Sequence, residues 1–180
     1  MNIPNILSLC RLGLVPVFCA VFFLPDERAH LWAAGVYALA SITDIADGFI
    51  AREYNQITRL GRVLDPLADK LMTFAVIICI TVDGLIPMWV VVIFFCKEVL
   101  MGLGALSLYR KVDDVITSDY LGKGATVAFF VVCVLLMVFP QIPEAWATAM
   151  ITGALALTLA AFFHYLWRYL ALMGKRKERR

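Results

Sequence analysis

Residues 44–69 read DIADGFIAREYNQITRLGRVLDPLAD, and apolar segments lie directly before and after this stretch. It contains four aspartates, Asp44, Asp47, Asp65 and Asp69. A carboxylate in the hydrocarbon of a bilayer costs about 2.5–3.5 kcal/mol on insertion scales. Four carboxylates so close together must be neutralised, and we expect the protein to function at this cluster.

The composition indicates a membrane protein. The chain has 180 residues, of which 62% are hydrophobic, and its mean hydropathy is +0.85. These values lie outside the usual range of soluble globular domains. We therefore expect an all-α, polytopic membrane protein in which residues 1–180 form a single domain.

Six apolar segments approach the length of about 20 residues that a helix needs to cross the hydrocarbon core. Polar or proline-containing breaks separate them, for example Pro25–Arg28, Asp83–Gly84 and Pro140–Glu144. Lipid cannot satisfy exposed backbone groups, so the helices are expected to pack as a bundle. The expected transmembrane helices span residues 6–24, 31–51, 66–83, 85–108, 122–139 and 146–171.

The placement of basic residues predicts the topology. They concentrate after the second and fourth expected helices and in the tail at residues 175–180, whereas the other loops hold almost none except Arg28. By the positive-inside rule, both termini and the aspartate cluster face the cytoplasm in a multi-pass protein of the cell membrane. The five cysteines are scattered singly through apolar segments, and we expect free thiols rather than disulfides.

Helical spacing places the residues after Asp44 on one face. Positions 44, 47, 48, 51 and 52 follow the pattern i, i+3, i+4, i+7 and i+8. Gly48 and Ala51 leave room for a ligand to approach the backbone. Arg52 offers a planar fork for phosphate oxygens.

The second pair of aspartates is expected at the beginning of the next helix. Asp65 followed by Pro66 is typical of an N-cap with proline at the first helical position. Asp69 then lies one turn further along on the same face as Asp65. The two helices can pack antiparallel, which would bring both aspartate pairs to one membrane face.

Four carboxylates in such a volume would bind one or two divalent cations, because hard cations prefer oxygen ligands. A metal pair can clamp phosphate oxygens and stabilise charge on a leaving phosphate. One carboxylate could instead accept the proton of an attacking hydroxyl. Spacing alone does not assign these roles.

The string D-x2-D-G-x2-A-R-x8-G-x3-D-x3-D is matched at every fixed position from Asp44 to Asp69. It resembles the signature of the CDP-alcohol phosphotransferases, which are six-helix membrane enzymes. The resemblance implies that a CDP-linked lipid binds through its pyrophosphate, that an acceptor hydroxyl attacks the lipid-bearing phosphate, and that CMP leaves. It also implies homodimers and no nucleic-acid partner.

The same resemblance implies residue roles. Asp44, Asp47 and Asp65 match metal ligands, and we expect two ions of Mg²⁺ or Mn²⁺. Asp69 matches the general base, which also touches metal. The positions that match the nucleotide and pyrophosphate pocket are Gly48, Ala51, Arg52 and Gly61.

The first half of the chain resembles bacterial phosphatidylglycerophosphate synthases, through the opening Asn2–Asn5 and the segment Leu64–Lys70. This resemblance implies CDP-diacylglycerol as the donor and glycerol 3-phosphate as the acceptor. The free phosphate of that acceptor needs cations, and the candidates are Arg11, Lys97, Arg110 and Lys123. Arg11 could also be a snorkelling anchor, Lys97 an ion-pair partner of Glu98, and Lys123 a flanking charge.

One departure keeps a second acceptor open. Residues 122–126 read GKGAT where those synthases usually show Gly-Lys-x-Lys-Thr, so Ala125 replaces the second lysine. Cardiolipin synthases of the same family keep one lysine there and share the Ile-Pro-Asn opening, which makes phosphatidylglycerol the alternative acceptor. We favour glycerol 3-phosphate.

A divalent-cation transporter is the alternative from another functional class. It would be expected to hold its acidic residues near the bilayer midplane. Here they cluster at one edge beside arginines, which repel cations and attract phosphate. The pattern therefore favours an enzyme embedded in the lipid bilayer.

Overall fold

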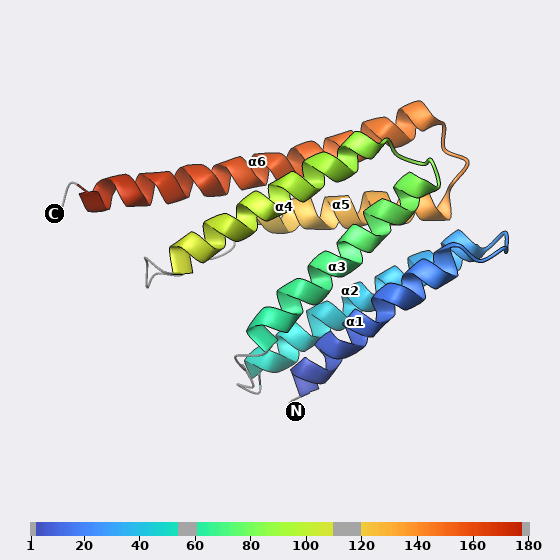
Figure 1. Cartoon of the computed structure of the whole chain (residues 1–180), viewed down its shortest axis with the longest axis horizontal. Helices are drawn as coiled ribbons and strands as arrows, with labels where there is room; N and C mark the ends of the chain where they lie inside the picture. The colour runs from blue at the N-terminus through green and yellow to red at the C-terminus, as the bar shows by residue number, and fades with distance from the viewer. Residues whose placement is uncertain (1–2, 54–60, 110–119, 178–180) are drawn as a thin grey trace. The chain divides into compact units, whose positions relative to one another are not determined.

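The computed structural model of the protein describes residues 3–53, 61–109 and 120–177 and the turns within these ranges, and this part of the chain is entirely α-helical. Its helices are α1 (Ile3–Phe22), α2 (Ala29–Glu53), α3 (Gly61–Val82), α4 (Met88–Tyr109), α5 (Tyr120–Val138) and α6 (Glu144–Lys177) (Figure 1). The expected all-α fold with helices at these six places in the sequence is thus confirmed for the described residues.

The beginning of α3 differs from the sequence prediction. The helix begins at Gly61 rather than next to Pro66, so Asp65 is a helical residue and not an N-cap. Pro66 lies in the second turn, where it removes one backbone hydrogen bond without ending the helix. The N-cap prediction is wrong because the preceding residues continue the helix toward the N-terminus.

The end of α3 follows the prediction at Asp83–Gly84. Gly84 has a φ of 81°, a conformation that glycine adopts without a steric penalty. Its N–H donates to the carbonyl of Thr81, and the N–H of Leu85 donates to the carbonyl of Ile80. These bonds form a Schellman motif, which satisfies the last carbonyls of the helix.

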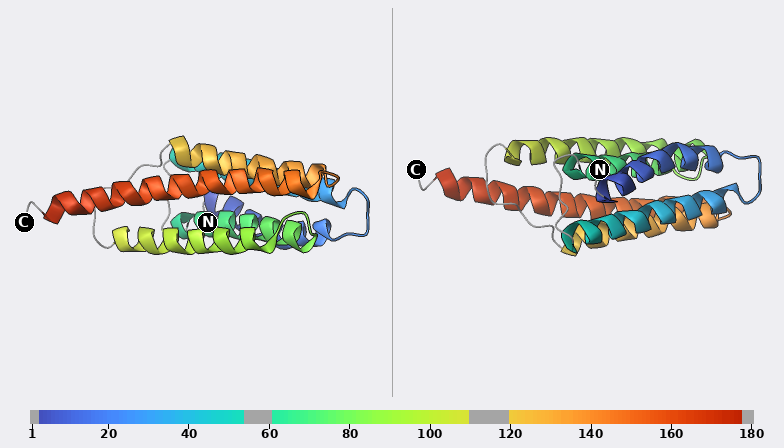
Figure 2. Two further views of the ribbon diagram at one scale, coloured as in Figure 1. Left: turned by 90° about the horizontal axis from the view of Figure 1, so that it is seen from above. Right: turned by 90° about the horizontal axis from the view of Figure 1, so that it is seen from below.

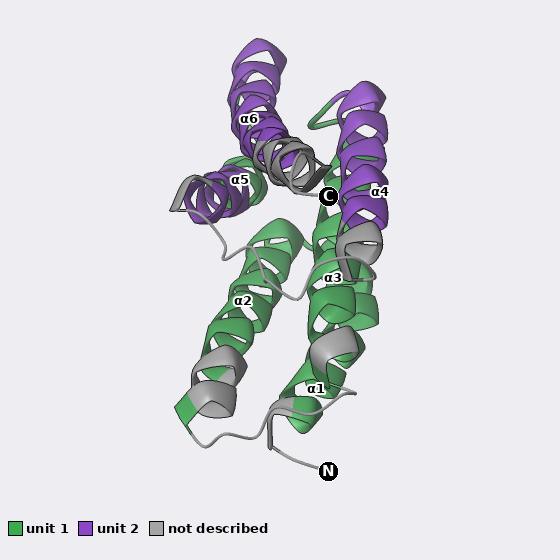
Figure 3. Cartoon of the chain, turned by 90° about the vertical axis from the view of Figure 1, so that its left-hand side faces the viewer, with its two compact units in different colours: residues 1–86, 133–142 green, residues 87–132, 143–180 purple. Residues whose placement is uncertain are grey.

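The chain divides into two compact units (Figure 3). Unit 1 comprises residues 1–86 and 133–142, and unit 2 comprises residues 87–132 and 143–180. Unit 1 contains α1, α2 and α3, and unit 2 contains α4, α6 and most of α5. Of the four aspartates predicted to bind metal, three have described side chains and lie in unit 1: Asp44, Asp65 and Asp69.

In unit 1, α1, α2 and α3 pack against one another. α1 and α2 run antiparallel and are joined by the turn at residues 23–28 (Figure 2). Small residues on α2, Ala33 and Ala40, are buried on the same face as Tyr37, whose ring meets Phe18 of α1 edge-on at a centroid distance of 6.4 Å. Small side chains at such positions let helices approach closely.

The cysteines are free thiols, as predicted. Two of them, Cys19 of α1 and Cys79 of α3, have sulfur atoms 3.9 Å apart in the packed helices. That separation is well beyond the length of a disulfide bond, about 2.05 Å. They therefore act as small apolar side chains of the helix interface.

In unit 2, α4 packs against α6. Phe94 of α4 and Phe129 of α5 are buried, and their rings stack at a centroid distance of 4.9 Å. Stacked aromatic pairs of this kind add about 0.5–1.5 kcal/mol beyond the area that they bury. The aromatic contact holds α5 to α4 within this unit.

Two of the described helices are long and apolar enough to cross a membrane by length and composition, through Asn5–Phe22 and Glu144–Trp167. The apolar part of α5, Gly122–Val138, is shorter. α6 has 34 residues. At a rise of 1.5 Å per residue it measures about 51 Å, which exceeds the hydrocarbon thickness of about 30 Å.

Candidate active site

Three of the predicted metal-binding aspartates lie at one end of unit 1. Asp44 lies on α2, and Asp65 and Asp69 lie on α3, one helical turn apart on the same face. The beginning of α1, the last turns of α2 and the first turns of α3 come to this end together (Figure 1). The antiparallel packing of the second and third helices, which the sequence predicted, is confirmed.

Arg11 of α1 contacts Asp44, with 2.5 Å between Nη1 and Oδ1. The Arg11 side chain is only 1% exposed, whereas that of Asp44 is 43% exposed. A buried guanidinium has lost its water, and without a negative partner its burial would cost several kcal/mol. The alternative interpretation of Arg11 as a snorkelling anchor is therefore wrong, because its charge faces the carboxylates inside the helix packing.

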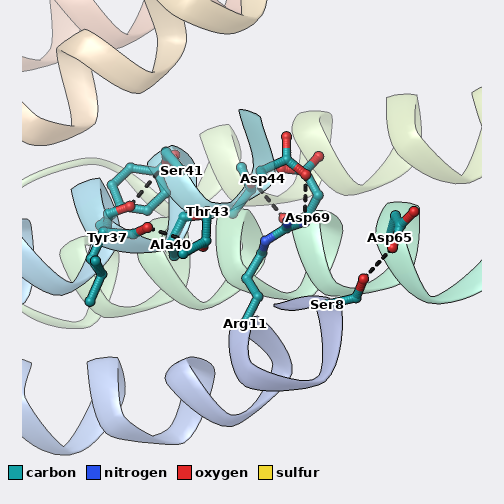
Figure 4. Close-up of polar contacts among 11 residues, drawn as sticks. Ser8, Arg11, Tyr37, Ala40, Ser41, Thr43, Asp44, Asp65 and Asp69 are labelled. Atoms are coloured by element: carbon teal, nitrogen blue, oxygen red, sulfur yellow. Dashed lines mark hydrogen bonds and ion pairs between the residues drawn. The ribbon is translucent and has the colours of Figure 1, made fainter. Parts of the chain in front are cut away.

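Ser8, one turn before Arg11 on α1, holds the next carboxylate. Its side chain is fully buried, and its hydroxyl donates a hydrogen bond to Oδ1 of Asp65 (Figure 4). The sequence analysis did not identify Ser8 as a site residue. The signal was present, because Asn5, Ser8 and Arg11 recur every three residues in a helix that is otherwise almost wholly apolar.

Asp69 reaches the same region from α3. Asp69 lies one turn after Asp65 on α3 (Figure 4). The backbone carbonyl of Asp69 accepts a hydrogen bond from Oγ1 of Thr73 at 3.0 Å. Asp69 is half-buried, so its carboxylate sits in surroundings of lower polarity than bulk water.

The donor chemistry of this cluster suits a hard divalent cation. Asp44, Asp65 and Asp69 offer carboxylate oxygens, which are the ligands that Mg²⁺ and Mn²⁺ prefer. Within the described side chains, however, no three His, Cys, Asp or Glu residues lie close enough together to form a complete metal site. The fourth predicted ligand, Asp47, lies in α2 but its side chain is outside the described part of the structure.

Most of the predicted pyrophosphate-binding residues have side chains outside the described part of the structure. The side chains at positions 48, 51 and 52 (Gly48, Ala51 and Arg52) also fall outside the described part. Gly61 is described: it begins α3 and is buried. It lies one turn before Asp65 on the same helix, so it belongs to the same end of unit 1 as the carboxylates.

The other predicted acceptor-binding cations belong to unit 2. Lys97 is buried in α4, with its Nζ 2.5 Å from Oε1 of Glu98 and 4.7 Å from the centroid of the Phe94 ring. The ion pair that the sequence suggested as the alternative role of Lys97 is therefore present. Lys123 is exposed near the beginning of α5, and Arg110 lies outside the described residues.

Residues 1–166 match the family model of the CDP-alcohol phosphatidyltransferases. The chain is 32% identical to the CDP-diacylglycerol–glycerol-3-phosphate 3-phosphatidyltransferase of Bacillus subtilis, over 93% of both chains. It is 33% identical to the Salmonella typhimurium protein of the same name, over 92% of this chain and 93% of the relative. It is 35% identical to a cardiolipin synthase (CMP-forming) of Streptomyces coelicolor, over 70% of this chain and 60% of the relative.

The contact between Ser8 and Asp65 predicts an effect on stability. Ser8→Ala removes a buried donor to a carboxylate and should lower the free energy of unfolding in detergent by about 1–2 kcal/mol. Ser41→Ala is the matched control, because the Ser41 hydroxyl donates to a carbonyl of its own helix, that of Tyr37, at 3.0 Å. Denaturant unfolding would compare the two; equal losses would show that the Asp65 contact adds no stability.

Proposed function

The chain belongs to the CDP-alcohol phosphatidyltransferase family, and on that basis we propose that it transfers a phosphatidyl group from CDP-diacylglycerol to glycerol 3-phosphate. The products are phosphatidylglycerophosphate and CMP. The observation that supports this proposal is the placement of Asp44, Asp65 and Asp69 at one end of unit 1, where the buried Arg11 contacts Asp44 and Ser8 donates to Asp65.

The proposed reaction is an in-line displacement at phosphorus. The acceptor oxygen forms a bond to the phosphate that carries diacylglycerol, and the bond from that phosphorus to the CMP oxygen breaks. The electron pair leaves with CMP, and the acceptor hydroxyl loses its proton. We assign the proton to Asp69, the position that matches the general base in the family resemblance.

The proposed ligands of Mg²⁺ or Mn²⁺ are the carboxylates of Asp44, Asp47 and Asp65, together with that of Asp69. A bound divalent cation would neutralise charge on the pyrophosphate and on the leaving CMP. Ser8 keeps Asp65 oriented, and Arg52 would add a bidentate donor for pyrophosphate oxygens.

Two features bear on the acceptor. Relatives of similar identity carry the names of both a glycerol-3-phosphate transferase and a cardiolipin synthase. Glycerol 3-phosphate brings a free phosphate dianion, and Lys123 is an exposed cation on α5 that is suited to it. We therefore retain glycerol 3-phosphate as the proposed acceptor and phosphatidylglycerol as the second candidate.

We further propose that all six helices span the membrane, with the aspartates on the cytoplasmic side. Two helices meet the length and composition test among the described residues. The charged site residues of α2 and α3 lie at one end of each helix and shorten the apolar window there. The basic residues after the second and fourth helices and in the C-terminal tail support this orientation.

The acceptor assay tests the reaction directly. Purified protein in detergent with CDP-diacylglycerol and Mg²⁺ or Mn²⁺ should release CMP when glycerol 3-phosphate is added, and much less with phosphatidylglycerol. Release with phosphatidylglycerol alone would change the proposal to cardiolipin synthesis. Absence of release with either acceptor and either metal would refute the proposed enzyme.

The carboxylate assignment predicts the effect of charge removal at the site. Asp44→Asn and Asp65→Asn should each lower CMP release by more than about 100-fold, since even residues that only support metal ligands change activity 10–100-fold. Asp83→Asn is the control: its carboxylate lies just past the other end of α3, 3.4 Å from Nε2 of His30. A similar loss in all three variants would indicate a folding defect rather than a site effect.

The proposed role of Lys123 predicts a selective change in substrate affinity. Lys123→Ala should raise the KM for glycerol 3-phosphate about 10-fold or more, the effect expected for a lost charge-assisted hydrogen bond, and leave the KM for CDP-diacylglycerol nearly unchanged. Lys123→Arg keeps the charge and should recover most of the affinity. Equal changes in both KM values would assign Lys123 a general structural role.

A further inference from the structure

The buried face of α1 changes in chemical character along the helix. Phe18 and Phe22 form its apolar part, and Asn5, Ser8 and Arg11 form its polar part. All five side chains are buried, so the polar part is built into the interior of unit 1. It ends at the carboxylates, because Ser8 donates to Asp65 and Arg11 contacts Asp44.

Arg11 depends on the ion pair with Asp44 more than Asp44 does. Asp44 is nearly half exposed and can be solvated by water, whereas Arg11 is almost wholly shielded from it. The guanidinium is charged at every physiological pH. The position of Arg11 therefore places a permanent positive charge next to the carboxylate of Asp44, whether or not a ligand is bound there.

We propose that Arg11 is an internal counter-cation that weakens the affinity of the aspartate cluster for divalent metal. Its Nη1 lies on one of the two carboxylate oxygens of Asp44, and that oxygen would have to be shared with or yielded to a metal ion. Its charge also opposes any other cation close to Asp44. This inference rests on the proposed metal role of the aspartates.

This role differs from the two that the sequence suggested for Arg11. An anchor would hold its charge at the membrane surface, and an acceptor-binding residue would keep its guanidinium open to a phosphate. The observed side chain does neither, because it is buried and directed at Asp44. A counter-cation would keep the metal exchangeable and would limit the negative charge of the cluster while no metal is bound.

The test measures metal binding rather than turnover. Purified protein in detergent is titrated with Mn²⁺ alone, and the free ion is followed by its electron paramagnetic resonance signal. The variants are Arg11→Met and Arg11→Gln, which remove the charge, and Arg11→Lys, which keeps it. Arg28→Met is the matched control, because Arg28 is exposed in the turn between α1 and α2.

The neutral variants should bind Mn²⁺ at least about tenfold more tightly than the unchanged protein, since a nearby unit charge repels a divalent ion on that scale even under water-like screening. Arg11→Lys and Arg28→Met should stay within about twofold. In an Asp44→Asn background, Arg11→Met should have a smaller effect, because the part that comes from freeing the Asp44 oxygen is lost while the charge repulsion remains. A purely structural arginine would give the opposite sign, with weaker binding in a loosened site.

Unchanged or weaker Mn²⁺ binding in a folded neutral variant would overturn the proposal. Thermal unfolding and gel filtration report whether each variant is folded. If Arg11→Met does not fold, the result for Arg11→Gln decides, because the glutamine amide can still form a hydrogen bond with Asp44. If neither neutral variant folds, Arg11 is a structural residue and the counter-cation role is rejected. Absence of Mn²⁺ binding by the unchanged protein would refute the metal role of the cluster itself, which is a distinct outcome.

Discussion

The burial of the Arg11 guanidinium is the constraint on which this end of unit 1 depends. A cation that is almost wholly removed from water requires negative charge within contact distance, and Asp44 of α2 supplies it. The contact joins α1 to α2, and the bond from Ser8 to Asp65 joins α1 to α3. One face of a single helix thus holds carboxylates from two others in register.

The buried apolar residues of unit 1 and its polar site residues lie on the same helix faces. On α1 the buried face runs from Phe22 and Phe18 to Arg11 and Ser8. On α2 it runs from Ala33 through Tyr37 and ends near Asp44. Apolar residues do not drive helices together in lipid as they do in water, so close van der Waals packing must fix the helix rotations. Those rotations then determine where the carboxylates point.

The sequence could predict the carboxylates but not their protein partners. The spacing from Asp44 to Asp69 identifies the acidic residues and their helical faces, because a helix repeats every 3.6 residues wherever it lies. Hydropathy does not show how a helix is rotated in an apolar bundle, since exposed Ile6 and buried Phe18 are both strongly hydrophobic. Ser8 was missed, and the beginning of α3 was misplaced, because both depend on tertiary packing.

Donor chemistry and acceptor choice depend on different parts of the chain. In the proposed reaction the aspartates act on the pyrophosphate, which every CDP-linked lipid carries, so their geometry does not distinguish one acceptor from another. The two candidate acceptors differ in charge, because glycerol 3-phosphate has a free phosphate and phosphatidylglycerol has only a diester. A cationic side chain can discriminate between the two acceptors, because it attracts the phosphate dianion more strongly than the diester. Lys97 is already engaged by Glu98, whereas Lys123 is exposed. Position 125 holds Ala125 rather than a second lysine, so the proposed recognition of the acceptor phosphate is assigned to Lys123.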